Sequence, residues 1–357
     1  MRHIPAELRM QTKRNTIRRA ALAALISASG LLLADEAKAS CVISGSVTFS
    51  AVGGEFLTCT VSEAGVYDIA AGGGHGGNFY VNSNVAAGKN AYGGSGAYVS
   101  GDISLAANQV LDIIVGNEAA NIYAGTYADQ VGGGGGASAV VWANGSSYIP
   151  YIVAAGGGGA AAIGEDGWAN GGGGNIYSGS ISPSGGTTAT TSTNSYSYGG
   201  GGGGFSSSGQ SSTGGEYTDG VGGAAFSSSA PGMTGGTGGT TAFNTGTGGY
   251  GGGGGGYQGG VGDPIIVSSG GTMPTTNNGG YSYYDTADLT NVNQLAGANN
   301  TGSAYQSMVS FDLVSASSSQ VSSSPSSGTS VPEPSGLSII LVAMGLLFGA
   351  RSLSLKT

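Results

Sequence analysis

The chain has 357 residues, and its 75 glycines are about three times the usual share. Only 8% of the residues are charged whereas 39% are hydrophobic, which is unlike the charge-rich, apolar-poor composition of a disordered chain. Residues 40–332 hold one lysine, no arginine and 15 acidic residues. This acidic body excludes nucleic acids and anionic membrane surfaces as partners, because both repel it.

Residues 1–39 have the order of a secretory signal peptide, which we expect to be helical. A basic region precedes the apolar run Ala20–Leu33, which is shorter than the roughly 20 residues of a membrane-spanning helix. Either Met1 or Met10 can be the true start, and Met10 gives a basic region of more typical length. The expected cleavage site is formed by Ala37, Ala39 and Ser40.

The body that follows contains short segments rich in Val, Ile, Tyr, Phe and Thr, a composition typical of strands. No stretch of the body has an apolar period of 3.6 residues, so we expect a mainly β domain over 40–314. The predicted strands are Val47–Ser50, Phe56–Val61, Val66–Ala70, Ala97–Leu105, Val110–Val115, Ala137–Trp142, Tyr151–Ala154 and Ser310–Val314.

Blocks of glycine separate these strands without a fixed period, which excludes collagen and regular solenoids. The blocks are Gly72–Gly74, Gly132–Gly136, Gly156–Gly159, Gly171–Gly174, Gly199–Gly204 and Gly251–Gly256. Two interpretations remain open: flexible loops, or extended polyglycine-II helices that bond laterally and so satisfy their backbone groups. The blocks from 132 to 174 adjoin apolar strands, which favours order there, and we expect 183–250 to be the looser part.

The order of these strands and blocks resembles the glycine-rich domain of anaplastic-lymphoma-kinase-type receptors and of many bacterial surface proteins. The resemblance covers roughly 45–315 and implies a β-sandwich fused to a bundle of polyglycine-II helices. Long Ser/Thr-rich inserts and the presence of only two cysteines depart from that family, and its partner-binding surface cannot be transferred. The segments that carry the resemblance are Gly65–Gly74, Gly93–Gly101, Leu111–Gly116, Gly132–Val141 and Ile152–Gly159.

Cys41 and Cys59 are the only cysteines, and export would place them in an oxidising compartment. We expect a disulfide between them, and the alternative is a pair of free thiols. By loop-closure arguments this disulfide would contribute about 3 kcal/mol.

Residues suited to catalysis or metal binding are few. His75, in a glycine-rich segment, is the only histidine of the exported region, and we interpret it as a polar residue on a glycine turn. The acid pairs Glu165-Asp166 and Asp285/Asp288, and the Gly259–Asp263 turn, could hold calcium loosely, but solvated carboxylates are the simpler interpretation. No nucleophile elbow, phosphate loop or zinc pattern is present. We therefore expect no enzymatic activity and no cofactor.

The C-terminal region begins with the serine-rich linker 315–330 and continues as a tail over 331–357. The tail consists of the motif Val331-Pro332-Glu333-Pro334, an apolar segment over 336–350 that we expect to be a transmembrane helix, and the basic stop Arg351. This order resembles the PEP-CTERM sorting tail of Gram-negative exopolysaccharide producers. The resemblance implies an exosortase-type transpeptidase as partner, with transient anchoring in the inner membrane. The alternative is a plain C-terminal anchor.

These features indicate an exported cell-envelope or exopolysaccharide-associated structural or adhesive protein, located at the cell surface or in the biofilm matrix. Exopolysaccharide is the candidate partner, and tyrosines are the candidate stacking faces for sugars. These tyrosines are Tyr123, Tyr177, Tyr196, Tyr198, Tyr250 and Tyr257. The alternative is a surface binding module for a glycan, a receptor or an ordered surface such as ice. An enzyme acting on polysaccharide ranks last, because no pair of carboxylates can be nominated.

Overall fold

The computed structural model describes part of the chain: residues 39–50, 53–81, 90–124, 129–163, 167–177, 179, 181–188, 199–213, 220–227, 232–237, 240–241, 248–249, 251–262, 278–298 and 307–317. They belong to a compact unit that ends at Ser317. The expected signal segment up to Lys38 lies outside the described residues, as do the rest of the serine-rich linker and the sorting tail. Within the described ranges, no helix has the length and apolarity needed to cross a membrane.

The eight strands expected from the sequence are all present, and none of the described residues is helical, which confirms the mainly β prediction. β-Branched and aromatic side chains favour these positions because they pack well on a pleated surface. The strands are β2 (Val47–Ser50), β3 (Gly53–Val61), β4 (Gly65–Gly72), β7 (Tyr98–Leu105), β8 (Val110–Asn117), β11 (Ser138–Asn144), β12 (Ser147–Ala154) and β19 (Met308–Ala316).

Two further strands of five or more residues were not expected, β1 (Ala39–Ile43) and β18 (Leu289–Leu295). Strand β1 begins at the expected cleavage site, so its first residues were assigned to the signal peptide and not to a strand. Strand β18 contains Asn291 with a φ of 52°, and its pairing with β7 shifts between Thr290 and Asn293. This irregularity interrupts the alternation of polar and apolar residues by which a strand is identified in a sequence.

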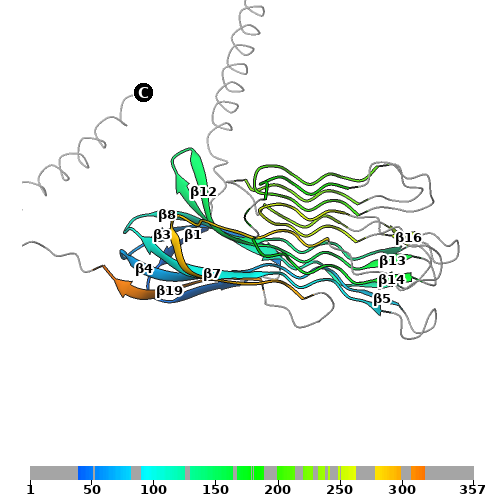
Figure 1. Cartoon of the computed structure of the whole chain (residues 1–357), viewed down its shortest axis with the longest axis horizontal. Coiled ribbons are helices and arrows are strands. Elements are labelled where there is room, and N and C mark those ends of the chain that lie inside the picture. The colour runs from blue at the N-terminus through cyan, green and yellow to red at the C-terminus, as the bar shows by residue number, and fades with distance from the viewer. Residues whose placement is uncertain are drawn as a thin grey trace, which may run out of the picture. The chain divides into compact units, whose positions relative to one another are not determined.

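Two large sheets form the first part of the fold (Figure 1). One is six-stranded in the order β1-β3-β8-β11-β12-β17, where β17 is Tyr283–Tyr284 and where only the β1–β3 pair is parallel. The other is five-stranded in the order β18-β7-β4-β19-β2, and all its pairs are antiparallel. The chain crosses repeatedly between the two sheets, so neither can form without the other.

Side chains from both sheets meet in one hydrophobic core. Tyr67 and Ile69 of β4 and Phe311 of β19 are fully buried in it, as are Ile113 of β8 and Ile152 of β12. Each such side chain contributes about 1.5–3 kcal/mol when it is removed from water. The Tyr67 hydroxyl keeps a partner by donating to the Glu63 carbonyl at 2.8 Å. This core fixes the sheets from which the glycine segments extend.

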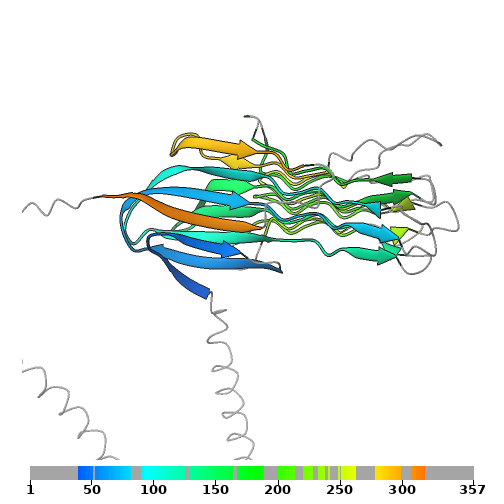
Figure 2. The same cartoon turned by 90° about the horizontal axis from the view of Figure 1, so that it is seen from below.

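Glycine-rich segments prolong the strands of the large sheets away from this core (Figure 1), and Figure 2 shows the same continuity from a second direction. Strand β4 runs through 73–78 into β5 (Phe79–Val81), and the chain returns from β6 (Asn90–Ala91) through 92–97 into β7. The same out-and-back path links β8 to β9 (Ile122–Ala124), β10 (Asp129–Gln130) to β11, and β12 to β13 (Ala161–Ile163). Each early glycine block therefore connects a strand of a large sheet at one end to a short outer strand at the other.

Short strands beyond the glycine segments form three small sheets. Their orders are β6-β5-β9, β10-β15 and β14-β13-β16. The strands not yet given bounds are β14 (Gly167–Ala169), β15 (Thr240–Thr241) and β16 (Gly248–Gly249). These pairs hold the ends of the glycine segments in register.

One boundary and one expectation about order are corrected by the structure. Strand β19 continues to Ala316, past the expected start of the linker at Ser315, because Ser315 and Ala316 still pair with Val66 and Gly65 of β4. The expectation that 183–250 is loose is wrong for its described segments, which are hydrogen-bonded to the other glycine segments. The remainder of 183–250 lies outside the described residues.

Candidate functional site: a hydrogen-bonded glycine array

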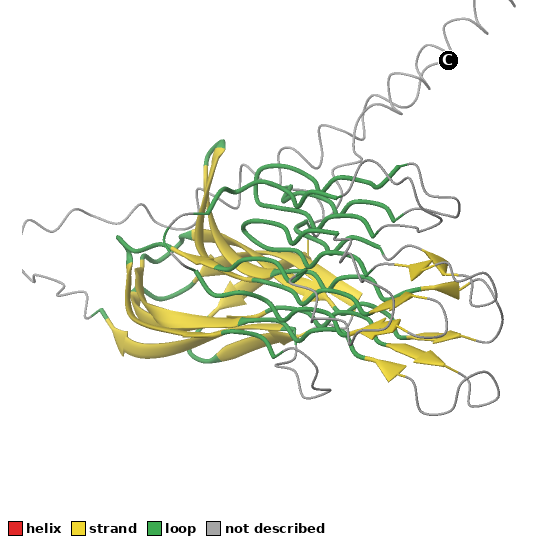
Figure 3. Cartoon of the chain, turned by 45° about the vertical axis from the view of Figure 1, so that its right-hand side comes forward, coloured by secondary structure: helices red, strands yellow, loops and turns green. Residues whose placement is uncertain are grey.

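The described glycine segments lie side by side and bond to one another laterally, as the green segments in Figure 3 show. We call this set the glycine array. It comprises 73–77, 93–97, 117–120, 131–137, 155–160, 171–175, 184–188, 199–210, 220–226, 232–237, 251–262 and 278–282. Backbone amides and carbonyls make most of its contacts, because few side chains are available to do so.

Successive amides of one segment donate to three different neighbours in rotation. In 156–160 the first and fourth donors reach one neighbour, the second and fifth reach another, and the third reaches a third neighbour. The bonds run from Gly156 to Gly255 (2.8 Å), Gly157 to Gly74 (3.0 Å), Gly158 to Gly172 (2.8 Å), Gly159 to Gly252 (2.9 Å) and Ala160 to Gly77 (3.0 Å). Amides that are three residues apart therefore point in the same direction.

The segment 251–256 repeats this pattern. The donors Gly252 and Gly255 reach carbonyls of 132–136, while Gly253 and Gly256 reach carbonyls of 199–204. The bonds run from Gly252 to Gly132 (3.0 Å), Gly253 to Gly200 (2.9 Å), Gly254 to Asn278 (2.7 Å), Gly255 to Gly135 (2.8 Å) and Gly256 to Gly203 (3.1 Å). An extended helix with three residues per turn and no internal hydrogen bonds has this directional repeat.

The spacing of the segments excludes side chains. A Cβ added at Gly156 would lie 2.1 Å from the Gly135 carbonyl oxygen, and one at Gly157 would lie 1.9 Å from the Gly94 carbonyl oxygen. Both distances are far below van der Waals contact, and the obstacle is backbone that cannot move aside. Glycine is therefore required at these positions by close approach of the neighbouring chains.

Asn278 is a buried side chain that braces the array, a role that no motif in the sequence indicated. Its Oδ1 accepts from the Gly172 amide at 2.8 Å, and its Nδ2 donates to the carbonyls of Gly159 (3.1 Å) and Gly252 (3.3 Å). A primary amide carries both donors and an acceptor, so it can imitate the peptide group of a glycine segment. An Asn followed by glycines is also a turn signal, which conceals this function.

His75 lies in the extended segment 73–78 and not on a turn, which corrects that part of the sequence-based interpretation. Its Nδ1 contacts the Gly76 carbonyl, and its Nε2 is buried without a partner among the described residues. Burial lowers the pKa of His75, while the Gly76 carbonyl and the nearby Glu118 carboxylate act in the opposite direction. Burial therefore favours the uncharged form of this imidazole.

A row of aromatic rings follows the outer face of the six-stranded sheet where the glycine array covers it. The consecutive rings are Tyr148, Phe226, Phe205, Tyr257, Tyr283 and Tyr177, with centroid separations from 4.2 to 5.8 Å. Tyr177 also meets Tyr284, which packs against the core between the two large sheets. Burial, followed by the nearby Asp285, raises the pKa of Tyr283 to about 12. Two of the candidate tyrosines, Tyr177 and Tyr257, therefore belong to this packed row.

A second tyrosine cluster lies on the small sheet β6-β5-β9 and beside it. Tyr80 and Tyr123 are register partners with stacked rings 5.1 Å apart, and Tyr92 meets Tyr80 edge-on. Tyr123 is 72% exposed, so one face of this stack is open to solvent. The remaining candidates Tyr196, Tyr198 and Tyr250 lie outside the described residues.

The acid pairs named in the sequence do not form a metal centre in the described part of the chain. Asp285 accepts from the Ala287 amide at 2.8 Å, as is usual at the start of a turn. Glu165-Asp166 and Asp263 lie outside the described residues. Among the residues that are described, no group of three or more His, Cys, Asp or Glu side chains could hold a metal ion.

Cys41 of β1 and Cys59 of β3 are register partners on adjacent parallel strands, with their Cα atoms 4.4 Å apart, and their sulfurs are joined in a disulfide. The bond ties the edge strand β1 to the rest of the six-stranded sheet. Ala39 begins β1, and Ser40 is exposed beside it. The other cleavage residue, Ala37, and the sorting residues Val331, Pro332, Glu333, Pro334 and Arg351 lie outside the described residues.

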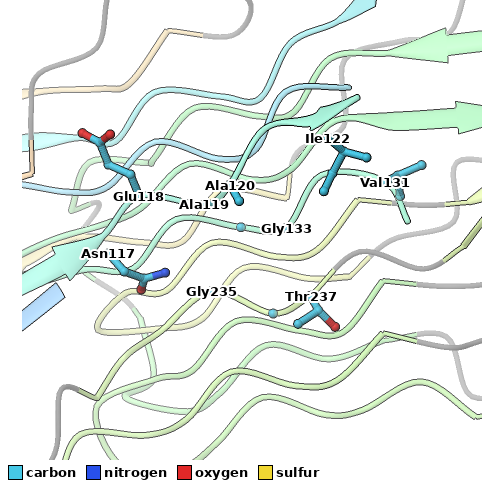
Figure 4. A pocket seen from close by; sticks show the side chains of 11 residues that line it. Asn117, Glu118, Ala119, Ala120, Ile122, Val131, Gly133, Gly235 and Thr237 are labelled. Atoms are coloured by element: carbon cyan, nitrogen blue, oxygen red, sulfur yellow. The ribbon is translucent and has the colours of Figure 1, made fainter. Parts of the chain in front are cut away.

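A groove of about 230 Å³ opens within the array (Figure 4). Asn117 and Glu118 lie at one end of it, and Ile122 and Val131 lie at the other. Glycines of two segments, 133–134 and 235–236, line the space between. Backbone thus forms much of its lining, as it does throughout the array.

Among the described residues, the most distinctive features are the hydrogen-bonded backbone of the glycine array and the two groups of packed aromatic rings. No protein-family model matches this sequence, and comparison with curated proteins finds no match. The geometry of the described residues is therefore the ground on which a function can be proposed.

Proposed function

We propose that this chain is an exported structural or adhesive protein of the cell envelope or exopolysaccharide matrix, sorted by an exosortase-type system. The observation that supports this most is the glycine array, in which lateral bonds between backbones leave no room for side chains. A dense array with few side chains offers a protease few recognition sites and resists bending. Those are properties of a spacer at the cell surface.

We also propose that the described part is a β-sandwich fused to a bundle of polyglycine-II helices. The shared core of the two large sheets supports the first assignment, and the threefold rotation of hydrogen-bond donors supports the second. This proposal agrees with the resemblance to the glycine-rich domain of anaplastic-lymphoma-kinase-type receptors.

Sorting can be tested by replacing Pro332, Glu333 and Pro334 with alanine in a tagged chain. The two prolines keep the motif extended and free of ladder hydrogen bonds, which suits a transpeptidase cleft. We expect the variant to remain in the inner membrane with its tail uncut, as judged by fractionation and by the mass of the tagged product. Pro325→Ala, in the serine linker, is the matched control and should sort normally. Normal maturation and release of the triple variant would rule out the sorting proposal.

A surface binding module for glycans is the second candidate. The stacked pair Tyr80 and Tyr123, with Tyr123 open to solvent, favours it because sugar rings pack on exposed aromatic faces. Such a module would bind a saccharide saturably at the small sheet β6-β5-β9. The two candidates are compatible, since a rigid spacer can carry a binding patch.

A further inference from the structure

The groove interrupts an otherwise close-packed array. It lies between the segment that follows β8 and the segment that contains Gly235, Gly236 and Thr237, and Gly133 and Gly134 line it between them (Figure 4). Its volume of about 230 Å³ is below the roughly 300–1,000 Å³ of small-molecule sites. A narrow slot between two extended segments is complementary in shape to a third extended segment.

Gly133 differs from the other glycines of its run. A Cβ built at Gly132, Gly134, Gly135 or Gly136 would lie 2.0 to 2.4 Å from another atom of the protein. At Gly133 the nearest atom, the Gly236 carbonyl oxygen, is 3.4 Å away, which is ordinary van der Waals contact. Space therefore exists above one position of a run that is closely covered at all its other positions.

Backbone donors along the groove have no partners among the described residues. The amides of Glu118, Ala120, Gly133 and Gly235 donate to no acceptor there, whereas the adjacent Gly132 and Gly134 amides each make a lateral bond. None of these four residues is buried, so their amides are accessible to an added chain. Such open donors match the carbonyl groups of an added chain, as in the addition of a strand to a sheet edge.

We propose that this groove binds an extended, glycine-rich peptide segment supplied by a separate polypeptide. Glycine is favoured because glycines 133–134 and 235–236 line the slot, and the segments of the array elsewhere lie too close together to admit side chains. A sugar is disfavoured because the described residues of the lining include no aromatic ring on which it could stack. Glu118 is the one charged residue among the described residues that line the groove, so a positive charge at the adjacent end of the peptide strengthens binding.

The test uses the full-length purified chain and a fluorescein-labelled peptide that contains a hexaglycine run, followed by anisotropy. We expect saturable binding that weakens at least about tenfold, or about 1.4 kcal/mol, when Gly133→Val fills the groove. A peptide in which N-methylglycine replaces glycine should bind equally poorly, because each added methyl group needs space that closely spaced chains do not leave and because the peptide also loses its own amide donors. The Gly133→Ala variant, whose added Cβ meets nothing closer than 3.4 Å, should keep the thermal midpoint of the parent and bind the peptide more weakly.

Several results would overturn the proposal. They are absence of saturable binding to the parent chain, binding to Gly133→Val that equals binding to the parent, or equal binding of the N-methylated peptide. Binding of a glucose oligosaccharide that Gly133→Val abolishes, in the absence of peptide binding, would make the groove a sugar site instead. If Gly133→Val lowers the thermal midpoint, the Gly133→Ala variant decides the outcome.

Discussion

At the scale of single residues, the array depends on glycine at most of its positions and on one buried asparagine side chain. Asn278 is the instructive case, because its amide replaces a peptide group and bonds to Gly159, Gly172 and Gly252. Glycine elsewhere permits close approach, whereas this asparagine fills the space and restores the hydrogen bonds. The array is therefore a matter of satisfied backbone groups as much as of small residues.

Replacing Asn278 with alanine should destabilise the protein. The change leaves the Gly172 amide and the Gly159 carbonyl without this partner in a buried place, and each such loss costs about 1–3 kcal/mol, whereas the Gly252 carbonyl still accepts from the Gly159 amide. We expect a lower midpoint in urea unfolding of the purified chain. Asn293→Ala on the exposed side of β18 is the control and should change stability by less than about 0.5 kcal/mol. Equal midpoints for the two variants would show that the brace is dispensable.

At the residue scale, the roles of some residues could be predicted from the sequence and the roles of others could not. Cys41 and Cys59 were named as a pair because only two cysteines exist, and the structure joins them. Asn278 could not be identified, since an asparagine before glycines has the same appearance in a turn. His75 was assigned to a turn because flanking glycines indicate one, yet close packing of neighbouring segments keeps it extended.

At the scale of elements, the five-stranded sheet carries a row of three aspartates on its outer face. Asp68 of β4 is the register partner of Asp102 of β7 and of Asp312 of β19. Asp102 accepts from Asn291 at 2.7 Å, and Asp312 accepts from the Ser46 hydroxyl. Partial burial, then Asp102, then Asp312, raise the pKa of Asp68. Like charges placed directly opposite each other weaken a sheet.

Asp68→Asn should stabilise the protein at neutral pH by about 0.2–1 kcal/mol, since it removes repulsion from both sides. Because the folded-state pKa of Asp68 lies above its unfolded value, the parent gains stability as the pH falls through that folded value. The advantage of the variant should therefore shrink on acidification and vanish below about pH 4, near the unfolded pKa. Thermal midpoints measured from neutral to acidic pH test this.

Asp102→Asn is the matched control for the aspartate row. Asp102 lies at the end of the row with one acidic neighbour, so its replacement should stabilise less than Asp68→Asn does. A lower midpoint for Asp68→Asn at neutral pH, or an advantage that does not depend on pH, would contradict this account.

Strands were more predictable than the segments between them. Segments rich in Val, Ile, Tyr, Phe and Thr identified β4, β8 and β12, because such side chains pack well on a pleated surface. Strand β8 and the end of β12 are buried on both faces, so composition and not alternation identifies them. Strand β18 was missed because its bulge at Asn291 breaks the period. The short strands β5, β9 and β13 have too few residues to show a pattern, and they exist because the glycine segments deliver them side by side. Tertiary arrangement, and not local preference, determines them.

At the scale of the whole described unit, the sheets and the array share the same chain passes. A strand such as β12 leaves the hydrophobic core and becomes the segment 155–160 without a break. Its amides then bond to segments about 80 residues earlier and about 95 residues later in the chain. Disruption of the array should therefore reach the core, and the two should unfold together.

Gly157→Ala tests this coupling, because its Cβ would lie 1.9 Å from the Gly94 carbonyl oxygen. In a Trp168→Phe background, fluorescence reports Trp142 of β11, which packs against the hydrophobic core. We expect Gly157→Ala to lower the urea midpoint measured by Trp142 fluorescence and by far-ultraviolet circular dichroism by the same amount. A Trp142 midpoint that stays fixed while the dichroism midpoint falls would show two independently stable parts.

The threefold rotation of donors in 155–160 and 251–256 also restricts how such a chain can change its length. One residue inserted into a glycine run turns every later amide by a third of a revolution, away from its acceptor and toward the wrong neighbour. Only insertions or deletions in multiples of three keep the register, whereas the connections beyond the small sheets have no such constraint. Drift in length over evolutionary time should therefore accumulate where the chain reverses direction and leave the runs themselves fixed.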